Sequence, residues 1–269
     1  MPEPLKNPIG VVSNCFSYQL EHGISLHEIL KRLMDEGFEA IELRQTCLGE
    51  CESKDHLADV TAIENLCAGT TCFTFDYAMN YPFLSADHDH DHDLHLNAGI
   101  DAAIACGGHM RLVDLSTTSE ELEVSLDDTV TNFLELICRV TDRGIRLSIE
   151  HSRQTWRQFW TVCERLKALG AESLYEFCFD PANFCMADMP GTWREAFISL
   201  RLDRISMIHL KQHADGAYTD VLCDGDVNWG VGKKMFINAN YRGPYLMEIR
   251  SSEDVWKKIR LSRQYWYNV

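Results

Sequence analysis

The sequence lacks any long apolar run: nothing approaches the roughly 18 consecutive apolar residues of a membrane-spanning helix. No apolar segment follows a basic start, so we expect neither a signal peptide nor a transmembrane helix. Basic residues are also scarce, because 25 Lys and Arg stand against 41 Asp and Glu, giving a formal net charge of -16. We therefore expect no nucleic-acid partner and no membrane partner, since both need a basic face.

The chain also lacks a linker rich in Pro, Gly or Ser, and its composition does not shift along its length. We therefore expect a single domain over residues 1–269. With 45% hydrophobic and 25% charged residues, it has the composition of a globular protein with a sizeable core. No glycine cluster follows the first strand-like segment, which argues against a doubly wound, dinucleotide-binding sheet.

The eleven cysteines do not suggest a disulfide framework. They are odd in number, scattered and mostly set among apolar residues, which favours free thiols in a reducing, cytoplasmic location. Cys47 and Cys51 (CLGEC) have the spacing of a redox pair, but without histidine partners two free thiols are the better interpretation.

What the sequence does contain is a regular alternation of strand-like and helical patterns. A capping box of Ser25 and Glu28 opens one of the helices, for example, and Gly37 ends it. Eight such units predict an α/β fold, a single (β/α)₈ TIM barrel with its active site at the C-terminal ends of the strands. The expected strands are residues 9–14, 38–43, 71–77, 110–115, 145–150, 174–180, 204–210 and 243–249.

The last four expected strands each end, or nearly end, in an acid or a histidine: Glu150, Asp180, His209 and Glu248. In a barrel these ends meet on one face. Three carboxylates and an imidazole would repel one another there unless a cation compensated them. The O₃N donor set predicts one divalent metal ion, Mn²⁺, Co²⁺ or Mg²⁺, with Zn²⁺ as a further option. For any one of the four alone, a capped or surface strand end explains the residue equally well.

Five segments resemble the xylose-isomerase-like TIM-barrel superfamily, which includes sugar-phosphate isomerases and epimerases, dehydratases of inosose and dehydroshikimate, and an endonuclease family. These segments are residues 25–43 (SLHEILKRLMDEGFEAIEL), 147–150 (LSIE), 179–183 (FDPAN), 208–211 (IHLK) and 246–249 (LMEI). The resemblance implies a metal held by Glu150, Asp180, His209 and Glu248. It also implies that Glu150 and Glu248 are catalytic, moving protons as base and acid while the metal stabilises an enediolate.

Two positions depart from the ketose 3-epimerases of this superfamily. Asn183 stands where those enzymes have a histidine, and Asp215 stands where they have an arginine. Both positions contact substrate in those enzymes, so the departures argue against a simple ketohexose epimerase. Missing metal histidines and the negative charge argue against the endonuclease.

Four further residues are candidates for substrate binding: Asn183, Lys211, His151 and Trp229. Lys211 should point the same way as His209 and hold an anionic group, although a surface salt bridge fits as well. His151 alternates away from Glu150, which favours packing over catalysis. Trp229 lies in a loop that resembles one near the superfamily's active site, where its ring would shield the pocket from water.

Other polar residues are weaker candidates for the pocket. Arg44 and Arg153 could bind an anionic group, and Asn14, Glu42 and Asp76 near early strand ends could line the wall. Residues 87–95 (DHDHDHDLH) have the composition of a second metal site. We expect them instead to form a loop and the start of a helix, where acids are favourable and alternating side chains do not converge.

The sequence thus predicts a metal-dependent isomerase or epimerase of a small hydroxy-carbonyl compound: a sugar, an inosose or a keto acid. A dehydratase using the same metal site, and a barrel that binds a small molecule without turnover, are the alternatives. The partner is a small-molecule substrate. The oligomeric state stays open, with a homo-oligomer among the options.

Overall fold

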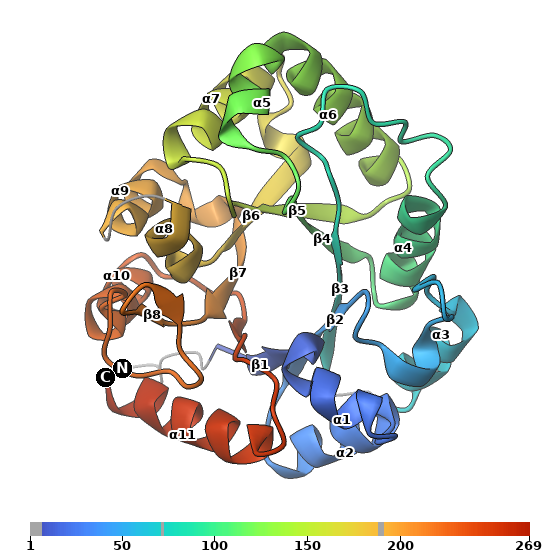
Figure 1. Ribbon diagram of the computed structural model, residues 1–269, viewed down its shortest axis with the longest axis vertical. Helices are drawn as coiled ribbons and strands as arrows, with labels where there is room; N and C mark the ends of the chain where they lie inside the picture. Colours follow the sequence, from blue (N-terminus) through green and yellow to red (C-terminus); the bar gives the residue numbers. More distant parts are fainter. Residues whose placement is uncertain (1–6, 71–72, 188–190) are drawn as a thin grey trace.

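Eight parallel strands close into a barrel surrounded by helices (Figure 1). The computed structural model describes residues 7–70, 73–187 and 191–269. Around the barrel the order is β1-β10-β7-β6-β5-β4-β3-β2, which confirms the predicted TIM barrel. The barrel strands are β1 (Ile9–Val12), β2 (Ala40–Arg44), β3 (Thr74–Asn80), β4 (His109–Val113), β5 (Arg146–Glu150), β6 (Tyr175–Phe179), β7 (Ile205–Leu210) and β10 (Tyr245–Met247).

The helices connect the strands and cover the outside of the barrel (Figure 1). The predicted capping box is present: Ser25 accepts from the backbone of Glu28, whose side chain accepts from the backbone of Ser25. The α-helices are α1 (Ser17–Glu21), α2 (Leu26–Asp35), α3 (Val60–Ala68), α4 (Leu94–Ala105), α5 (Ser119–Val124), α6 (Leu126–Thr141), α7 (Trp156–Ala168), α8 (Pro181–Ala187), α9 (Thr192–Ser199), α10 (Trp229–Asn238) and α11 (Val255–Asn268).

Some elements differ from the sequence-based expectation. The first strand ends at Val12, and residues 13–16 form a 3-10 turn that carries Asn14 beyond the strand. The third strand lies about three residues later than expected, and Thr71 and Cys72, at its expected start, lie outside the described residues. Helices α5 and α8 and a two-stranded hairpin, β8 (His213–Ala214) with β9 (Ala217–Tyr218), were not predicted. These pieces are too short to show a hydrophobic period.

The core has two parts. A large apolar cluster fills the space between the strands and the helices. A smaller one consists of Val12, Ala40, Cys178, Met207 and Leu246. The last three stand two positions before the candidate ligands on β6, β7 and β10, and alternate residues of a strand point the same way. The smaller cluster therefore packs next to the candidate ligand side chains, on the same side of these strands.

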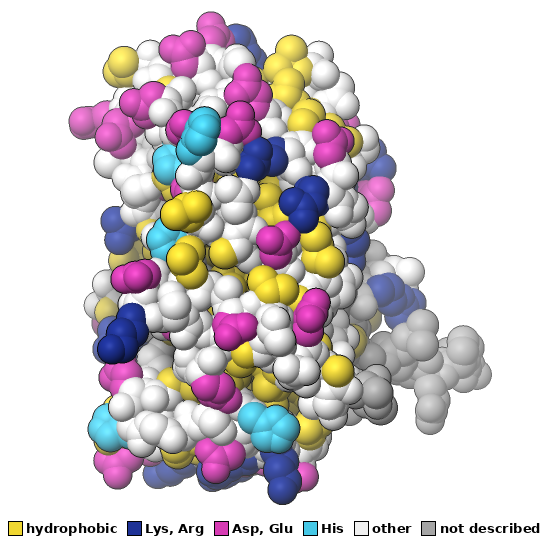
Figure 2. All heavy atoms as spheres, turned by 90° about the vertical axis from the view of Figure 1, so that its right-hand side faces the viewer, with side chains coloured by type: hydrophobic (Ala, Val, Ile, Leu, Met, Phe, Trp, Pro, Cys, Tyr) yellow, Lys and Arg dark blue, Asp and Glu magenta, His cyan; other side chains and the backbone are white. Residues whose placement is uncertain are grey.

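Figure 2 shows one side of the molecule, where apolar side chains lie in small groups among acidic and basic ones. Within the described part of the chain, no helix is long and apolar enough to cross a membrane. The ten cysteines that the structure describes, Cys47 and Cys51 among them, are all free.

Candidate metal centre

Four strand ends bring the four predicted ligands together inside the mouth of the barrel. Glu150 is the last residue of β5, Asp180 follows β6, His209 is the penultimate residue of β7, and Glu248 follows β10. One potential ligand atom from each lies within 4.8 Å of the others, and all four residues are buried. Residues that are spaced one βα unit apart in the sequence therefore lie close together in the structure.

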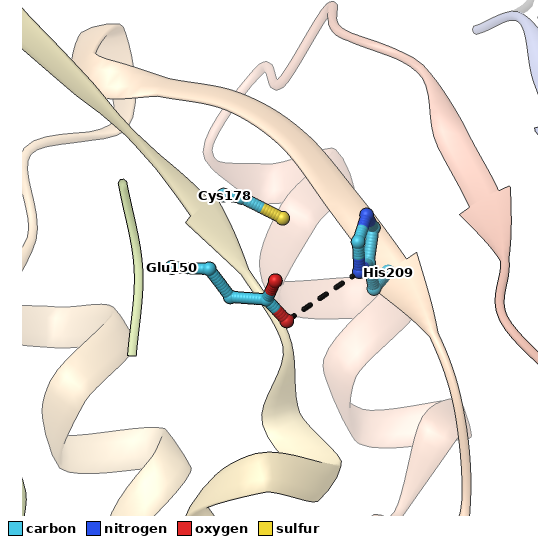
Figure 3. Close-up of side chains that lie close together, drawn as sticks. All are labelled: Glu150, Cys178 and His209. Carbon is cyan, nitrogen blue, oxygen red and sulfur yellow. Dashed lines mark ion pairs between the residues drawn. The ribbon is translucent and has the colours of Figure 1, made fainter. Parts of the chain in front are cut away.

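His209 provides the clearest test of whether these residues fit a metal ion. Its ring is fully buried, and neither ring nitrogen has a hydrogen-bond partner among the described residues. Nδ1 lies 3.5 Å from Oε1 of Glu150 and 3.4 Å from Oε2 of Glu248. Figure 3 shows the Glu150 carboxylate facing this ring. A buried, unpartnered imidazole nitrogen between two carboxylates suits a divalent cation, because burying such an atom without a partner costs free energy.

A buried arginine forms an ion pair with Glu150. Arg111 on β4 is fully buried and donates from Nη1 to Oε2 of Glu150. Its Nε and Nη2 donate to the two carboxylate oxygens of Glu42, at 2.8 and 2.5 Å. Asn183 donates from Nδ2 to the other oxygen of Glu150 at 2.8 Å. Sequence analysis missed Arg111, although an arginine inside an apolar strand is a signal, since a buried charge requires partners.

Glu248 and Asp180 are also held in place. Glu248 accepts from Nδ2 of Asn14 at 2.7 Å, from Nη1 of Arg44 at 2.8 Å and from Nζ of Lys211 at 2.9 Å. Oδ1 of Asp180 accepts from the backbone of the first turn of α8, and Oδ2 lies 3.4 Å from Nζ of Lys211. The three carboxylates are thus fixed before any ligand arrives, which reduces the cost of ordering them.

The electrostatics of the cluster favour positive charge where the ligand atoms meet. Burial opposes ionisation of Glu150 and Glu248, yet Arg111 lowers the pKa of Glu150, and Lys211 lowers that of Glu248 well below its usual range. Burial raises the pKa of Asp180 to about 6, against the opposing charge of Lys211. Burial also disfavours a charged His209, but its acidic neighbours raise its pKa well above the usual value. A divalent cation would take over this compensating role.

Cys178 offers a competing donor. Its sulfur, with Glu150 and His209, forms a second group of potential ligand atoms within 4.8 Å (Figure 3). Burial raises the pKa of this thiol to about 12, and a protonated thiol is a poor ligand. The O₃N set is therefore the better site. Cys178 is one of the cysteines that the sequence sets among apolar residues, although its position two residues before Asp180 puts it on the same face of the strand.

A cavity of about 360 Å³ opens onto this cluster. Glu150 and Glu248 lie in its wall together with several cationic, polar and apolar side chains. The remaining lining residues are Arg44, Val113, Leu115, Ser152, Arg153, Asn183, Met186, Ala187, Lys211 and Tyr218.

Residues 30–265 match the model of a protein family described as xylose isomerase-like TIM barrel. The chain belongs to this family. Similar solved structures include a probable 3-DHS dehydratase, AsbF, from Bacillus anthracis (13% identity, 97% of this chain and 99% of that one, TM-score 0.71). A D-tagatose 3-epimerase-like protein is similar to a comparable degree (15% identity, 97% and 98% coverage, TM-score 0.70).

A xylose isomerase-like TIM barrel protein from Mycobacterium smegmatis, solved in complex with magnesium, is 16% identical and covers 100% of this chain and 98% of its own, with a TM-score of 0.66. No curated protein matches the sequence significantly. At these identities the structural likeness concerns the fold alone.

The other candidate residues of this xylose isomerase-like barrel differ in whether they line the cavity. Asn183 and Lys211 line the cavity and donate to the candidate ligands Glu150 and Glu248, respectively. His151 is buried, with Nε2 2.6 Å from the backbone oxygen of Gln154 and its ring stacked on Phe184, which agrees with the packing role. Tyr218, which sequence analysis missed, is brought to the cavity by the β8–β9 hairpin and donates to Oδ1 of Asn183 at 2.7 Å.

Trp229 is the candidate that the structure removes from the pocket. It begins α10, is fully buried, and packs edge-on against Trp266 at 5.8 Å between ring centroids. It is not among the residues that line the cavity, so its ring does not shield that cavity from water. The loop resemblance therefore does not indicate where this side chain points.

Residues 87–95 form a loop and the start of α4, as expected. Asp93 caps the helix by accepting from the backbone of residues 95 and 96, and His88 lies 2.8 Å from Asp93. His90 pairs with the hydroxyl of Tyr81 at 2.6 Å. Among the described residues, groups of three or more potential metal ligands are confined to the barrel.

Proposed function

We propose that the protein is a divalent-metal-dependent isomerase or epimerase of a small hydroxy-carbonyl compound, such as a sugar, an inosose or a keto acid. The observation that carries this proposal is the buried cluster of Glu150, Asp180, His209 and Glu248, whose ligand atoms lie within 4.8 Å of one another beside a cavity. Similarity to a D-tagatose 3-epimerase-like protein supports it at the level of the fold family.

These four residues would hold one divalent ion. Oxygen and imidazole donors suit Mn²⁺, Co²⁺ or Mg²⁺, with Zn²⁺ as a further option. When bound, such an ion supplies a Lewis acid that polarises a carbonyl and acidifies the neighbouring C–H bond. The rest of the chemistry falls to side chains of the chain itself.

Glu150 and Glu248 are the residues we assign to proton transfer. Both line the cavity, and both carry pKa values lowered by cationic neighbours, so both are ionised at neutral pH. One carboxylate would remove the proton from the carbon next to the carbonyl and, once protonated, could return it to the same face. For return from the opposite face, the other carboxylate would first have to take up a proton from solvent. Asn183 and Lys211 each donate to one of them and keep their oxygens aimed at the cavity.

A dehydratase is the second candidate, and Tyr218 is the observation that favours it. Burial raises the pKa of its phenol, which therefore keeps its proton. Tyr218 lines the cavity, with Nζ of Lys211 4.3 Å from its ring centroid and its hydroxyl hydrogen-bonded to Asn183. A group that holds a proton here could protonate a departing hydroxide. Asn183, at a position where ketose 3-epimerases carry histidine, also leaves room for this alternative.

Solvent deuterium tests the proposal. Ketoses, inososes and keto acids are incubated in D₂O with the metal-loaded protein, and mass spectrometry follows incorporation of deuterium and loss of water. We expect deuterium next to the carbonyl of at least one compound, and Glu248→Gln should abolish it. Glu253→Gln, an exposed site away from the cavity, is the matched control. Exchange that persists in Glu248→Gln would remove Glu248 from proton transfer, and water loss would favour the dehydratase.

A further inference from the structure

The balance of charge in the metal centre has a consequence for the substrate. Four buried carboxylates belong to one connected cluster: Glu42, Glu150, Asp180 and Glu248. Three cationic side chains pair with them: Arg44, Arg111 and Lys211. A metal-bound histidine ring is neutral, so in the loaded protein the charged side chains sum to one unit negative and the divalent ion makes the cluster one unit positive. Removal of a proton beside a carbonyl creates one negative charge on the substrate. The single positive charge of the loaded cluster would balance it.

Arg153 adds a cation that this balance does not use. It lies in the loop after β5, two residues beyond His151, and it is exposed while lining the cavity. Among the described residues it has no ion pair, hydrogen bond or ring contact, in contrast to Arg44, Arg111 and Lys211. In a chain with a net charge of -16, a guanidinium without a carboxylate partner at the mouth of a cavity is notable.

We propose that the substrate carries a permanent anionic group, a carboxylate or a phosphate, and that Arg153 binds it. This inference rests on the proposed function, because it assumes that an ion occupies the cluster. The reacting end of the substrate lies against Glu150 and Glu248, and the anionic end lies toward Arg153. The planar guanidinium can donate two parallel hydrogen bonds to either kind of group. Neutral sugars would leave this cation unpaired.

A matched set of hydroxamates tests the inference without knowledge of the substrate. Butanohydroxamate chelates a metal ion and ends in a methyl group. The monohydroxamates of succinic and glutaric acid end in a carboxylate, and phosphonoacetohydroxamate ends in a phosphonate. Isothermal titration of each into Mn²⁺-loaded protein should give about five- to tenfold tighter binding for the best anionic probe than for the neutral one. The carboxylate and phosphonate arms distinguish the two kinds of anion.

Arg153→Gln should remove this preference and leave butanohydroxamate binding unchanged. Arg157→Gln removes an equal charge from a nearby arginine of α7 that does not line the cavity, and it should keep the preference. Equal or weaker binding of all anionic probes would overturn the inference, as would a preference that survives in Arg153→Gln. Failure of the protein to bind Mn²⁺ would instead overturn the proposed function itself, so the two failures are distinguishable.

Discussion

Oε2 of Glu42 lies 3.4 Å from Nε2 of His209, on the opposite edge of the ring from Glu150 and Glu248. Burial opposes ionisation of Glu42, but Arg111 and His209 lower its pKa to about 2, so it stays a carboxylate. When the ring is neutral, as a metal ligand is, a carboxylate at this position favours the form with the proton on Nε2. It therefore leaves Nδ1 free to face the ligand cluster, as partners behind metal-binding histidines commonly do.

Replacing this carboxylate should weaken metal binding. Glu42→Gln removes the charge that holds the ring form of His209, and we expect about tenfold weaker affinity for Mn²⁺ by isothermal titration. Glu39→Gln, three residues earlier on the same segment, is the control and should bind Mn²⁺ like the unmodified protein. Unchanged affinity in a folded Glu42→Gln protein, judged by circular dichroism, would contradict the role given to Glu42.

Lys211 should have opposite effects on binding and on turnover. Its ammonium lies 2.9 Å from Glu248 and 3.4 Å from Asp180, where it competes electrostatically with a cation. Lys211→Met should therefore bind Mn²⁺ severalfold tighter, because a repelling charge is gone. The same variant should lose at least roughly tenfold in deuterium exchange, since an orienting group at the cavity is missing. Weaker Mn²⁺ binding in this variant would show that Lys211 supports the ion instead.

His90 predicts a pH dependence of stability that is separate from the metal centre. Burial, and then the charge of His88, lower its pKa to about 4 from the usual 6.5, with Asp93 and Arg139 also nearby. The unfolded chain takes up a proton near pH 6.5, whereas the folded chain does so only near pH 4, so the free energy of unfolding falls as pH drops between these values. Urea denaturation should show a loss of about 2 kcal/mol between pH 7 and pH 5 from this group.

His90→Asn provides the comparison, because its amide can still meet the hydroxyl of Tyr81. The variant should be less dependent on pH over this interval by about that amount. An identical pH profile in the two proteins would mean that His90 titrates normally in the folded state.

Trp229 should matter for stability and not for the metal. Its side chain is fully buried against Trp266, so Trp229→Ala should reduce the free energy of unfolding by about 3–5 kcal/mol. Trp229→Phe should cost less, and this milder variant is suited to binding measurements. Its Mn²⁺ affinity should stay within about twofold of the unmodified protein, and a larger loss would return Trp229 to the site.

The candidate ligands at the strand ends could be predicted from the sequence. The side chains that hold these ligands in place were harder to predict. Glu150, Asp180, His209 and Glu248 recur at the spacing of one βα unit, and the closed barrel converts that spacing into proximity. Arg111 lies in the interior of its strand, where its partner Glu42 comes from a strand 69 residues away in sequence. No local pattern encodes such a pair.

Tyr218 and Trp229 show the two ways in which local reasoning falls short. Tyr218 reaches the cavity through a hairpin of two-residue strands, and such short pieces leave no periodic signal. Trp229 occupies an N-terminal helical position whose side chain turns into the core instead of toward the cavity. Side-chain direction at an element boundary depends on tertiary packing, which a motif does not specify.

Mn²⁺ titration of the purified, chelator-treated protein tests the metal centre most directly. The account predicts one ion per chain with a dissociation constant in the micromolar range or below. Asp180→Asn should weaken binding at least roughly tenfold, since it removes one anionic ligand while its remaining oxygen can still cap α8. Absence of micromolar binding, or equal binding by Asp180→Asn, would contradict the account.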